Sequence, residues 1–490
     1  MTRDPHPSTA ELAYRDAVDV LTALGDGALT SEQLVTALLE RIDAIDAMDS
    51  DVALRSIIAV APDALTLAQT RDAQRARGEL VGPLHGLPIV IKDNIEAVGL
   101  PCTAGSLALL DSPVAADAPV VEQLRAAGAI VLAATNLSEW ANIRSGASTS
   151  GWSAVGGLTG NPWALDRSPG GSSAGSGAAL AAGLAPLAIG TETDGSIVCP
   201  AAVNGVVGLK PTVGRISSRG IVPISHSQDT AGPMARTVRD VALLWSALSG
   251  DTPDDRPDVT IGVVQQWRIG YSHTDAVFDA AVAQLRVSEA FAAVVDVEVP
   301  DMGPSEHADE LRVMLTELHD DLGAYLQQRQ PTSGVRSLAD VVAFNRDHAA
   351  TELSLFGQEL FELALQWGGI DDEAREARTR NVQWARTVCL DPAFATVDLL
   401  IAPTYAPAWK SDFVLGHPQM GGAVTSPAAV AGYPLLSLPM GLVAGLPVGL
   451  TIVGPAHSEA LILGAAARIE AVLGLAGPGW RPSWRAPGRG

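Results

Sequence analysis

Apolar positions recur at helical spacing in some segments of this chain and run without interruption in others. Residues 30–46 carry apolar side chains at helical spacing, and Thr30 with Gln33 fits a capping box at the start of that helix. A second helix is predicted over residues 117–127. Apolar runs of strand length are predicted at 87–91, 129–133, 259–265, 398–403, 435–440 and 447–454, and the last two are typical of a hairpin.

The middle of the chain has a different composition. Residues 145–220 are rich in Gly, Ser, Thr and Pro and carry few charges, as a flexible linker would. Apolar runs such as AALAAGLAPLAIG interrupt this stretch, however, and such runs need burial. We therefore expect tightly packed backbone with many turns here, and not a linker.

The second half of the chain begins with a surface break at residues 250–258, GDTPDDRPD. From about 270 to 395 the pattern is helical and charged. Strand and helix patterns alternate on both sides of this region, which predicts one α/β domain with a helical insertion. We expect that domain to cover residues 1–476, followed by a mobile tail rich in Pro, Gly and Arg at 477–490.

Composition and charge narrow the classes of function. The chain has 490 residues, 47% of them hydrophobic, and 32 basic against 55 acidic side chains give a net charge of −23. An acidic surface repels phosphate backbones, so we expect no nucleic-acid partner. No apolar run is long enough to cross a bilayer and no secretory signal is visible, which favours a cytoplasmic protein without membrane contact. Export with prior cleavage of a signal stays open.

Cysteine and histidine usage offers no sign of a disulfide framework or a metal. Three cysteines, an odd and sparse set, fit a reducing compartment. The nine histidines are scattered, and neither CxxC nor HExxH occurs. We expect no metal and no cofactor.

The glycine-rich segment 168–177, SPGGSSAGSG, admits three interpretations. A phosphate cradle is one, but the segment lacks the third glycine of a dinucleotide fingerprint and a later GLKP lacks the Walker Ser or Thr. A nucleophile elbow centred on Ser173 formally matches GxSxG, although the residues before it are not strand-like. Close packing of small residues is the third interpretation and, for this segment alone, the simplest.

Two further places could carry chemistry. The turn GTETDGS, residues 190–196, follows an apolar strand-like run and could point several N–H groups into one cavity as an oxyanion hole. Ser196 ends this turn, and could equally be a helix N-cap. Lys92 ends the apolar run 87–91, where burial would lower its pKa. Taken alone, a lysine whose head reaches water is the more common reading.

Together these places resemble the amidase signature family. The resemblance covers GLPIVIKDN at 86–94, TNLSEW at 135–140, the signature from 168 to 212, QDTAGPMART at 228–237 and AGYPLLSLPMGLVAGLPVGLTIVG at 431–454. Several motifs in the right order make it specific, and GTETDGSIVCPA looks most like the peptide amidase branch, which removes C-terminal amides from peptides. It implies a single α/β/α domain with a large twisted mixed sheet. Residues 270–395 match weakly, so we expect this variable region to build the substrate pocket.

The resemblance also implies a Ser-Ser-Lys triad. By motif position the base is Lys92, the bridging residue is Ser172 after a cis peptide bond from Gly171, and the nucleophile is Ser196. The oxyanion donors would be the backbone N–H groups of four consecutive residues, Thr193, Asp194, Gly195 and Ser196. Many members have Gly where this chain has Asp194, which is tolerable if the side chain points away from the site.

Other residues are weaker candidates, each with a structural alternative. Thr191 and Asp229 could brace the signature loop, and Ser173 could support its backbone. Five residues could line the pocket or simply pack: Trp140, Arg144, Trp152, Tyr405 and Trp409. Cys199 reads as a small buried hydrophobe.

The expected partner is a small-molecule or peptide amide, bound by a monomer or homodimer. A peptide C-terminal amide is the first choice of substrate, and anilides, other small amides and carbamates are alternatives. Two other roles stay open: the catalytic subunit of a tRNA-dependent amidotransferase, and a catalytically silent binding protein.

Overall fold

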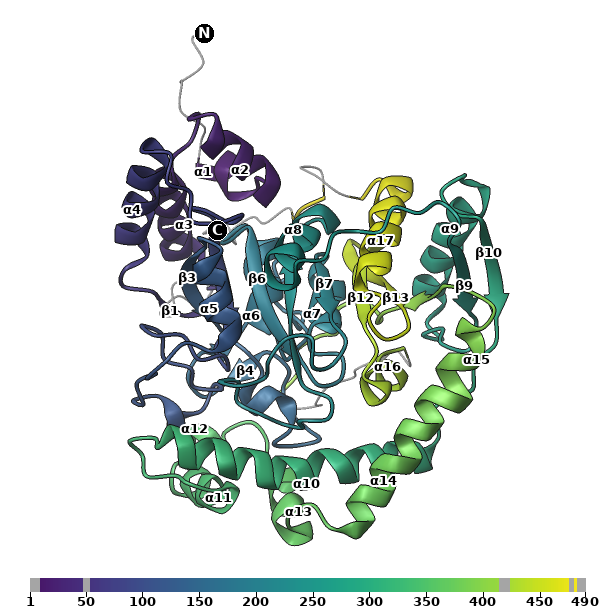
Figure 1. The fold of residues 1–490 in the computed structure, drawn as a ribbon. Coiled ribbons are helices and arrows are strands. Elements are labelled where there is room, and N and C mark those ends of the chain that lie inside the picture. The colour runs from purple at the N-terminus through teal and green to yellow at the C-terminus, as the bar shows by residue number, and fades with distance from the viewer. Residues whose placement is uncertain (1–8, 47–52, 414–423, 476–479, 483–490) are drawn as a thin grey trace.

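The computed structural model describes residues 9–46, 53–413, 424–475 and 480–482, and its centre is a mixed sheet of eleven strands (Figure 1). From one edge to the other the strands are β1 (Ile57–Val60), β3 (Ile130–Thr135), β2 (Pro88–Lys92), β6 (Leu187–Glu192), β8 (Thr230–Ala235), β7 (Val207–Lys210), β12 (Leu435–Val443), β13 (Leu446–Val453), β11 (Leu399–Pro403), β9 (Thr260–Val264) and β10 (Ala293–Val297).

The sheet is parallel in two blocks and antiparallel between them. Strand β2 runs parallel to both β3 and β6, and β9 runs parallel to both β10 and β11. Every pair from β6 across to β11 is antiparallel, including the β12–β13 hairpin. The predicted α/β fold with a large mixed sheet is therefore confirmed. A separate two-stranded pair is formed by β4 (Trp152–Ser153) and β5 (Gly157–Leu158).

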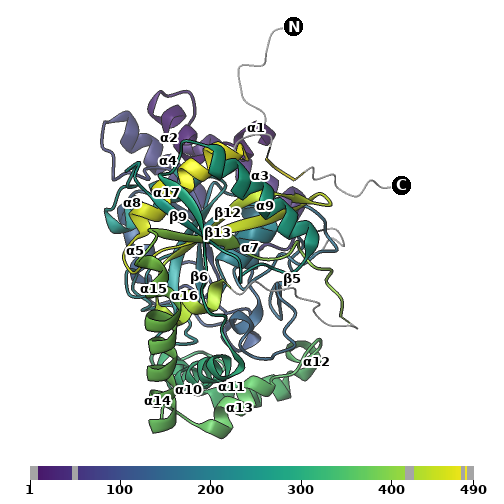
Figure 2. The ribbon, with the colours of Figure 1, turned by 90° about the vertical axis from the view of Figure 1, so that its right-hand side faces the viewer.

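Helices cover both faces of the sheet. One group packs along one face and includes α8, α9 and α17, while α6 and α7 pack against the sheet from the other side (Figures 1 and 2). The helices packed around the sheet are α1 (Thr9–Ala13), α2 (Ala17–Gly25), α3 (Ser31–Asp46), α4 (Ala64–Ala76), α5 (Pro119–Ala126), α6 (Ala174–Ala181), α7 (Val198–Asn204), α8 (Val238–Ser249), α9 (Ser272–Val287) and, after the β12–β13 hairpin, α17 (Glu459–Leu473). No helix in these described segments is long and apolar enough to cross a membrane.

A second layer of helices lies below the sheet in the view of Figure 1. The longest helix of this layer is α10 (Pro304–Arg329), whose 26 residues span about 39 Å. The rest of the layer is α11 (Leu338–Asp347), α12 (Ala349–Glu352), α13 (Glu359–Trp367), α14 (Asp372–Gln383), a π-helical turn (Trp384–Leu390), α15 (Asp391–Phe394) and, next to the sheet, α16 (Thr425–Ala431). Apolar side chains of α10, α11 and α13 form a separate core with residues 102–114 and 140–143.

The innermost strands are buried along their whole length. Strands β2, β3 and β6 have no exposed position, as expected of parallel strands covered on both faces. Small residues let helix α6 pack closely against the backbone at the ends of β1 and β3: a Cβ on Gly175 would collide with the carbonyl oxygens of Ser56 and Asn136. The expectation of tight packing in the Gly-rich region is thereby confirmed.

Most of the predicted elements are present, and the structure changes the expectation at two places, the region 270–395 and the tail. The helix over 30–46 is α3, and its capping box forms, since the Thr30 N–H donates to Gln33 Oε1 and the Gln33 N–H to Thr30 Oγ1, both at 3.0 Å. The expectation of helix throughout 270–395 is wrong at β10, a half-exposed edge strand. The tail lies mostly outside the described residues, but Trp480 is held, donating from its ring nitrogen to the Gly205 carbonyl at 2.8 Å.

Candidate active site

The site lies where strands β2 and β6 end side by side. Lys92 is the last residue of β2 and Glu192 the last of β6. Because these neighbouring strands are parallel, their carboxyl ends meet at the same edge of the sheet, which is the usual place for a site in α/β folds. The segments that begin helices α6 and α7 come to the same edge, and they bring Ser172 and Ser196.

Lys92 is completely buried, so the alternative interpretation, in which its head reaches water, is wrong. Its Nζ lies 2.7 Å from Ser172 Oγ, 2.8 Å from Thr191 Oγ1 and 3.3 Å from the Thr191 carbonyl oxygen. Thr191 Oγ1 also accepts a hydrogen bond from Asn94 Nδ2 at 3.0 Å. The lysine is therefore held from β6 on one side and faces Ser172 on the other.

Burial also changes the proton affinity of this lysine. Desolvation lowers the pKa of Lys92 to about 7, against the opposing influence of the nearby carboxylates Asp229 and Glu192. Near neutral pH the amine is thus divided between its charged and neutral forms. A lysine with this pKa can accept a proton under ordinary conditions, which a lysine at the surface cannot.

The two serines that precede α6 are arranged differently. The peptide bond between Gly171 and Ser172 is cis, as the resemblance implied, and the Ser172 hydroxyl faces Lys92. The Ser173 hydroxyl instead donates to the Thr191 carbonyl at 3.1 Å and accepts from the Thr191 N–H at 3.2 Å. No strand directly precedes this segment, so the strand–turn–helix context of a nucleophile elbow is absent from the described structure around Ser173.

The turn after β6 presents backbone N–H groups. Gly195 has φ +78°, in the left-handed region that favours glycine, and reverses the chain just before Ser196. Among the described residues, no hydrogen-bond acceptor engages the N–H of Thr193, Asp194, Gly195 or Ser196. Glu192 Oε2 accepts hydrogen bonds from the next two N–H groups along the chain, those of Ile197 at 2.6 Å and Val198 at 3.0 Å. The N-cap alternative for Ser196 is wrong, because α7 begins at Val198 after Ile197.

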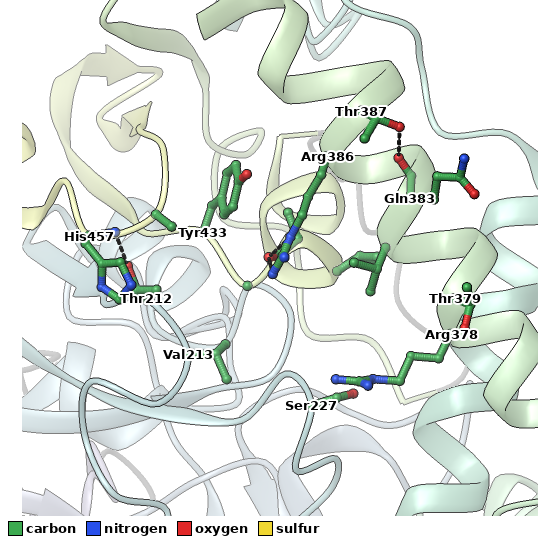
Figure 3. Close-up of a pocket in the computed structure, with 15 residues that line it drawn as sticks. Thr212, Val213, Ser227, Arg378, Thr379, Gln383, Arg386, Thr387, Tyr433 and His457 are labelled. Carbon is green, nitrogen blue, oxygen red and sulfur yellow. Dashed lines mark hydrogen bonds between the residues drawn. The ribbon is translucent and has the colours of Figure 1, made fainter.

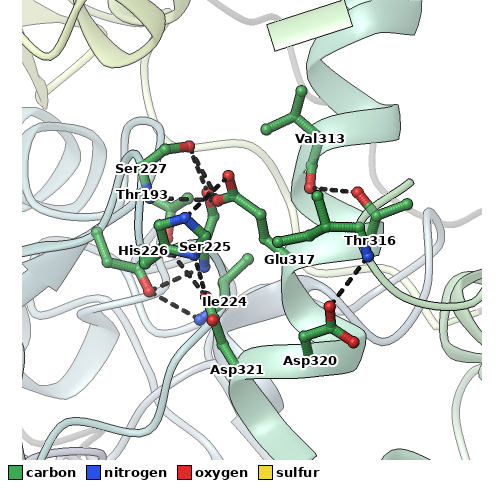
Figure 4. A network of polar contacts seen from close by, with 12 residues as sticks. Thr193, Ile224, Ser225, His226, Ser227, Val313, Thr316, Glu317, Asp320 and Asp321 are labelled. Atoms are coloured by element: carbon green, nitrogen blue, oxygen red, sulfur yellow. Dashed lines mark hydrogen bonds and ion pairs between the residues drawn. The ribbon is translucent and has the colours of Figure 1, made fainter. Parts of the chain in front are cut away.

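A buried carboxyl group braces this turn. Asp229 Oδ1 accepts from Thr193 Oγ1 at 2.6 Å, while Oδ2 accepts the N–H groups of Ile224 and Ser225. Burial raises the pKa of Asp229 to about 6. Figure 4 shows how the same loop is tied to α10, where Glu317 accepts from Ser227 Oγ at 2.9 Å. The turn is thus connected to the helical layer through residues 224–229.

Ser172 and Ser196 line one small cavity at this edge. Asn94, Thr191, Thr193 and Asp229 line it too, together with Ala141, Glu192, Ile221, Val222, Ile224 and Thr230. Backbone contacts keep the two serine segments together, since the Ser173 N–H donates to the Ser196 carbonyl at 3.1 Å. Asp194 does not intrude, because its Oδ2 accepts from Ser426 Oγ on α16 at 2.6 Å. The cavity therefore brings together two serine residues and a turn with free N–H groups, and the buried Lys92 lies behind Ser172.

This arrangement agrees with what comparison with known proteins finds. The family model described as Amidase matches residues 33–463. The chain belongs to the amidase family. The native peptide amidase of Stenotrophomonas maltophilia is 43% identical, with a TM-score of 0.86 over 94% of this chain and 98% of that one.

Two further relatives widen the comparison. A peptide amidase bound to the competitive inhibitor chymostatin is also 43% identical, with a TM-score of 0.88 over 96% of this chain and 99% of that one. A glutamyl-tRNA(Gln) amidotransferase subunit from Streptomyces avermitilis is 35% identical, over 93% of this chain and 95% of that protein. This amidase is accordingly a hydrolase that acts on amide bonds.

The five residues expected to line the amidase pocket fall into two groups. Trp140 lines a neighbouring cavity that shares Asn94 and Ala141 with the first. Tyr405 lies beside the turn, since a Cβ on Gly195 would be 2.8 Å from its hydroxyl, and it packs with Trp409 and Cys199. Both aromatic side chains are buried, as is Cys199.

Arg144 and Trp152 line neither of these two cavities. The Arg144 guanidinium is completely buried, 2.5 Å from Glu139 and 3.6 Å from Glu352. It lies over the ring of Phe356, against which Trp152 also packs edge-on. These contacts favour the structural alternative for both residues.

Sequence reasoning missed several residues of the amidase site. Asn94 and Glu192 hold Lys92 and the start of α7 in place, and Ser426 anchors Asp194. Asn94 and Glu192 adjoin residues that the motifs had singled out, so their position was a usable signal. Ser426 offered none, because it comes from a segment far along the chain.

In the described part of the chain, one cluster combines side chains of the kinds that ligate metals: His226, Glu317 and Asp321. Its histidine nitrogens face carboxylates, with Nδ1 2.9 Å from Asp321 and Nε2 3.4 Å from Glu317. These contacts, visible in Figure 4, satisfy the ring and tie the 224–229 loop to α10. The cluster is accounted for as a structural link.

Proposed function

We propose that this amidase removes the C-terminal amide of peptides, with Ser196 as nucleophile, Ser172 as proton relay and Lys92 as base. The observation that carries the proposal is the contact of 2.7 Å between a fully buried Lys92 Nζ and Ser172 Oγ, beside a cavity that Ser172 and Ser196 both line. A pKa near 7 makes this lysine available as a base without a histidine.

The contacts of Lys92 suit its neutral form. A neutral amine has two N–H donors and one lone pair. The Thr191 carbonyl can only accept. The Thr191 hydroxyl has two acceptor lone pairs, of which Asn94 uses one, so both oxygens can accept N–H donors of the lysine. The lone pair is then left for the Ser172 hydroxyl, which in turn can accept the proton of Ser196.

The reaction follows from this relay. As Ser196 Oγ attacks the amide carbon, its proton passes to Ser172 and the Ser172 proton to Lys92. The oxyanion is stabilised by the N–H groups of residues 193–196. The relay then reverses and protonates the leaving nitrogen, so that ammonia departs and an acyl-enzyme remains. Water hydrolyses the acyl-enzyme by the same route and restores Ser196.

Peptide amides are the favoured substrates because of the likeness to peptide amidases, at 43% identity over nearly the whole chain. Anilides, other small amides and carbamates would suit the same residues. The relative in Streptomyces avermitilis supports a second candidate, the catalytic subunit of a tRNA-dependent amidotransferase. In that role the enzyme would hydrolyse glutamine and pass the ammonia to a partner protein.

A substrate panel tests the proposal. The purified enzyme is given blocked dipeptide amides, the matching anilides and carbamates, and free glutamine, with ammonia or amine release as the readout. We expect kcat/KM to be highest for the peptide amides, with release of ammonia. Preference for an anilide or carbamate would overturn the choice of substrate, and glutamine turnover without peptide-amide turnover would favour the amidotransferase.

A further inference from the structure

A second, larger cavity lies along the same edge of the sheet. Its volume is about 810 Å³, and it is formed between helix α14 with its π-helical turn and the ends of strands β7, β12 and β13 (Figure 3). Its walls include Thr212 and Ser227 from one side and Thr379 and Gln383 from the other. It is distinct from the small cavity that holds Ser172 and Ser196.

The charge of this cavity contrasts with that of the whole molecule. Arg378, Arg386 and His457 line it, and none of its fifteen lining residues is acidic, although the chain carries a net charge of −23. Figure 3 shows the guanidinium groups of Arg378 and Arg386 directed toward its centre.

Acidic side chains near this cavity lie behind its walls and are held by other groups. Glu459 accepts from the Thr212 N–H, and Asp391 accepts from the Tyr433 hydroxyl. The two guanidinium groups are therefore the charges that face the cavity.

These two arginines have donors to spare. Arg386 gives its Nε and Nη2 hydrogens to the Ala431 carbonyl, an uncharged acceptor, at 3.0 and 2.7 Å. Arg378 has a carboxylate neighbour, since its Nε lies 3.9 Å from Glu317 Oε1, but this separation is too long for a hydrogen bond. A planar guanidinium with free N–H groups is suited to a carboxylate ligand.

Two short segments of the chain lie next to both this cavity and the active site. Ser227 lines the large cavity and Asp229, two residues further, lines the small one, a separation of at most about 7 Å along the chain. On α16, Ser426 holds Asp194 while Val430, one turn or about 6 Å along the helix, lines the large cavity. An extended peptide covers such distances with about two or three residues.

We propose that this cavity binds acidic side chains of the substrate, on the acyl side of the amide that is cleaved. The proposal rests on the proposed function, because it takes the substrate to be a peptide amide. A Glu or Asp about two to four positions before the C-terminal residue places its carboxylate between Arg378 and Arg386, with the side-chain amide of Gln383 as a further donor. The amidase then prefers peptide amides that are acidic at that distance.

Matched peptides test this preference. Blocked hexapeptide amides carry Glu, Gln or Lys at the second, third or fourth position before the C-terminal residue and are otherwise identical. We expect kcat/KM for Glu to exceed that for Gln about five- to tenfold at one of these positions, as an added charge-assisted hydrogen bond at a partly exposed site would give. Lys at that position should be the poorest substrate.

Variants assign the effect to the cavity. Arg378→Glu should reverse the order so that Lys exceeds Glu, and this ratio does not depend on how much of the variant is folded. Arg375→Gln is the matched control, since Arg375 lies one turn away on α14, pairs with Asp372 and does not line the cavity. It should keep the wild-type ratio.

The outcomes separate this inference from the proposed function. Equal rates for Glu and Gln at all three positions would overturn the acidic subsite and leave the peptide amidase intact. A preference for Glu that survives in Arg378→Glu would also overturn it, by moving the subsite elsewhere. Failure of the wild type to hydrolyse any peptide amide would reject the proposed function and this use of the cavity with it.

Discussion

Lys92 shows what sequence alone leaves undecided about a single residue. A lysine after the apolar run 87–91 is, from the local pattern alone, more commonly the end of a strand that reaches solvent. Its burial depends on contacts made by residues about eighty and a hundred positions away, Ser172 and Thr191. The local pattern therefore predicts the strand, and only the tertiary structure, or several motifs matched together, identifies the buried base.

The pKa of Lys92 predicts a pH dependence with a definite sign. Protonated Lys92 has no lone pair, so the relay fails below its pKa of about 7 and operates above it. We expect kcat/KM for a peptide amide to fall about tenfold per pH unit below pH 6 and to level off above pH 8. The measurement is kcat/KM between pH 5 and 9.

One variant identifies the group that titrates. Asp229, whose pKa of about 6 lies in the same range, raises that of Lys92 through its negative charge. In Asp229→Asn the fall of kcat/KM at acid pH, the acid limb of the profile, should persist and move to lower pH, even if the maximal rate drops. A limb that disappears in this variant, or a wild-type profile that is flat from pH 5.5 to 8.5, would contradict the role of Lys92.

At the scale of elements, the structure shows why buried ion pairs are hard to anticipate. Arg144 looked like a pocket residue, but it joins the segment after β3 to the helical layer through Glu139 and Glu352. Both acidic partners are buried, and nothing in the sequence pairs a charge at 144 with one at 352. The three residues form a contact between elements, which local patterns do not encode.

Breaking this contact should cost stability. Arg144→Met leaves Glu139 and Glu352 buried without their cation, and we expect the free energy of unfolding to fall by about 3–5 kcal/mol. The control is Arg346→Met, which removes an exposed pair with Glu362 and should cost no more than about 1 kcal/mol. Chemical denaturation of the two variants measures the difference. Equal, small losses would show that the Arg144 cluster contributes little.

Strands were predictable where the chain carries a long continuous apolar run. β7 and β8 are buried along their length but were missed, because β7 is short and β8 is interrupted by Thr, Gly and Pro. The runs that became β2, β3, β9, β11 and the hairpin are continuous and apolar, and the structure confirms them. β10 was missed because it is an edge strand, half exposed and carrying Asp296, within a region dominated by helices. Edge strands carry a weaker apolar signal, so their absence from the prediction has a physical cause.

The whole molecule is organised by a sheet that draws on distant parts of the chain. β7, from the middle of the chain, pairs with β12 near its end. β9, just before the expected variable region, and β10, within it, complete the far edge. Such an order cannot be derived from local patterns, and here only the family resemblance implied it. The site depends on it because β2 and β6 must be neighbours.

This continuity predicts cooperative unfolding. Because one sheet contains strands from all parts of the chain, the strands that carry the active site, β2 and β6, should unfold together with β9 and β10 at the far edge. We expect the loss of far-UV circular dichroism, of tryptophan fluorescence and of amidase activity on heating to coincide within about 2 °C. Two separate transitions, with activity lost in the first, would show instead that residues 1–476 do not behave as one domain.

The central claim, that Ser196 is the nucleophile and Ser173 a structural neighbour, is tested most directly by two alanine variants assayed on one peptide amide. Ser196→Ala should lower kcat by more than about a thousandfold, because no other hydroxyl would then begin the reaction. Ser173→Ala removes two hydrogen bonds to Thr191 and should keep kcat within about tenfold of the wild type. Full activity in Ser196→Ala would contradict the account, as would retention of activity there together with its loss in Ser173→Ala.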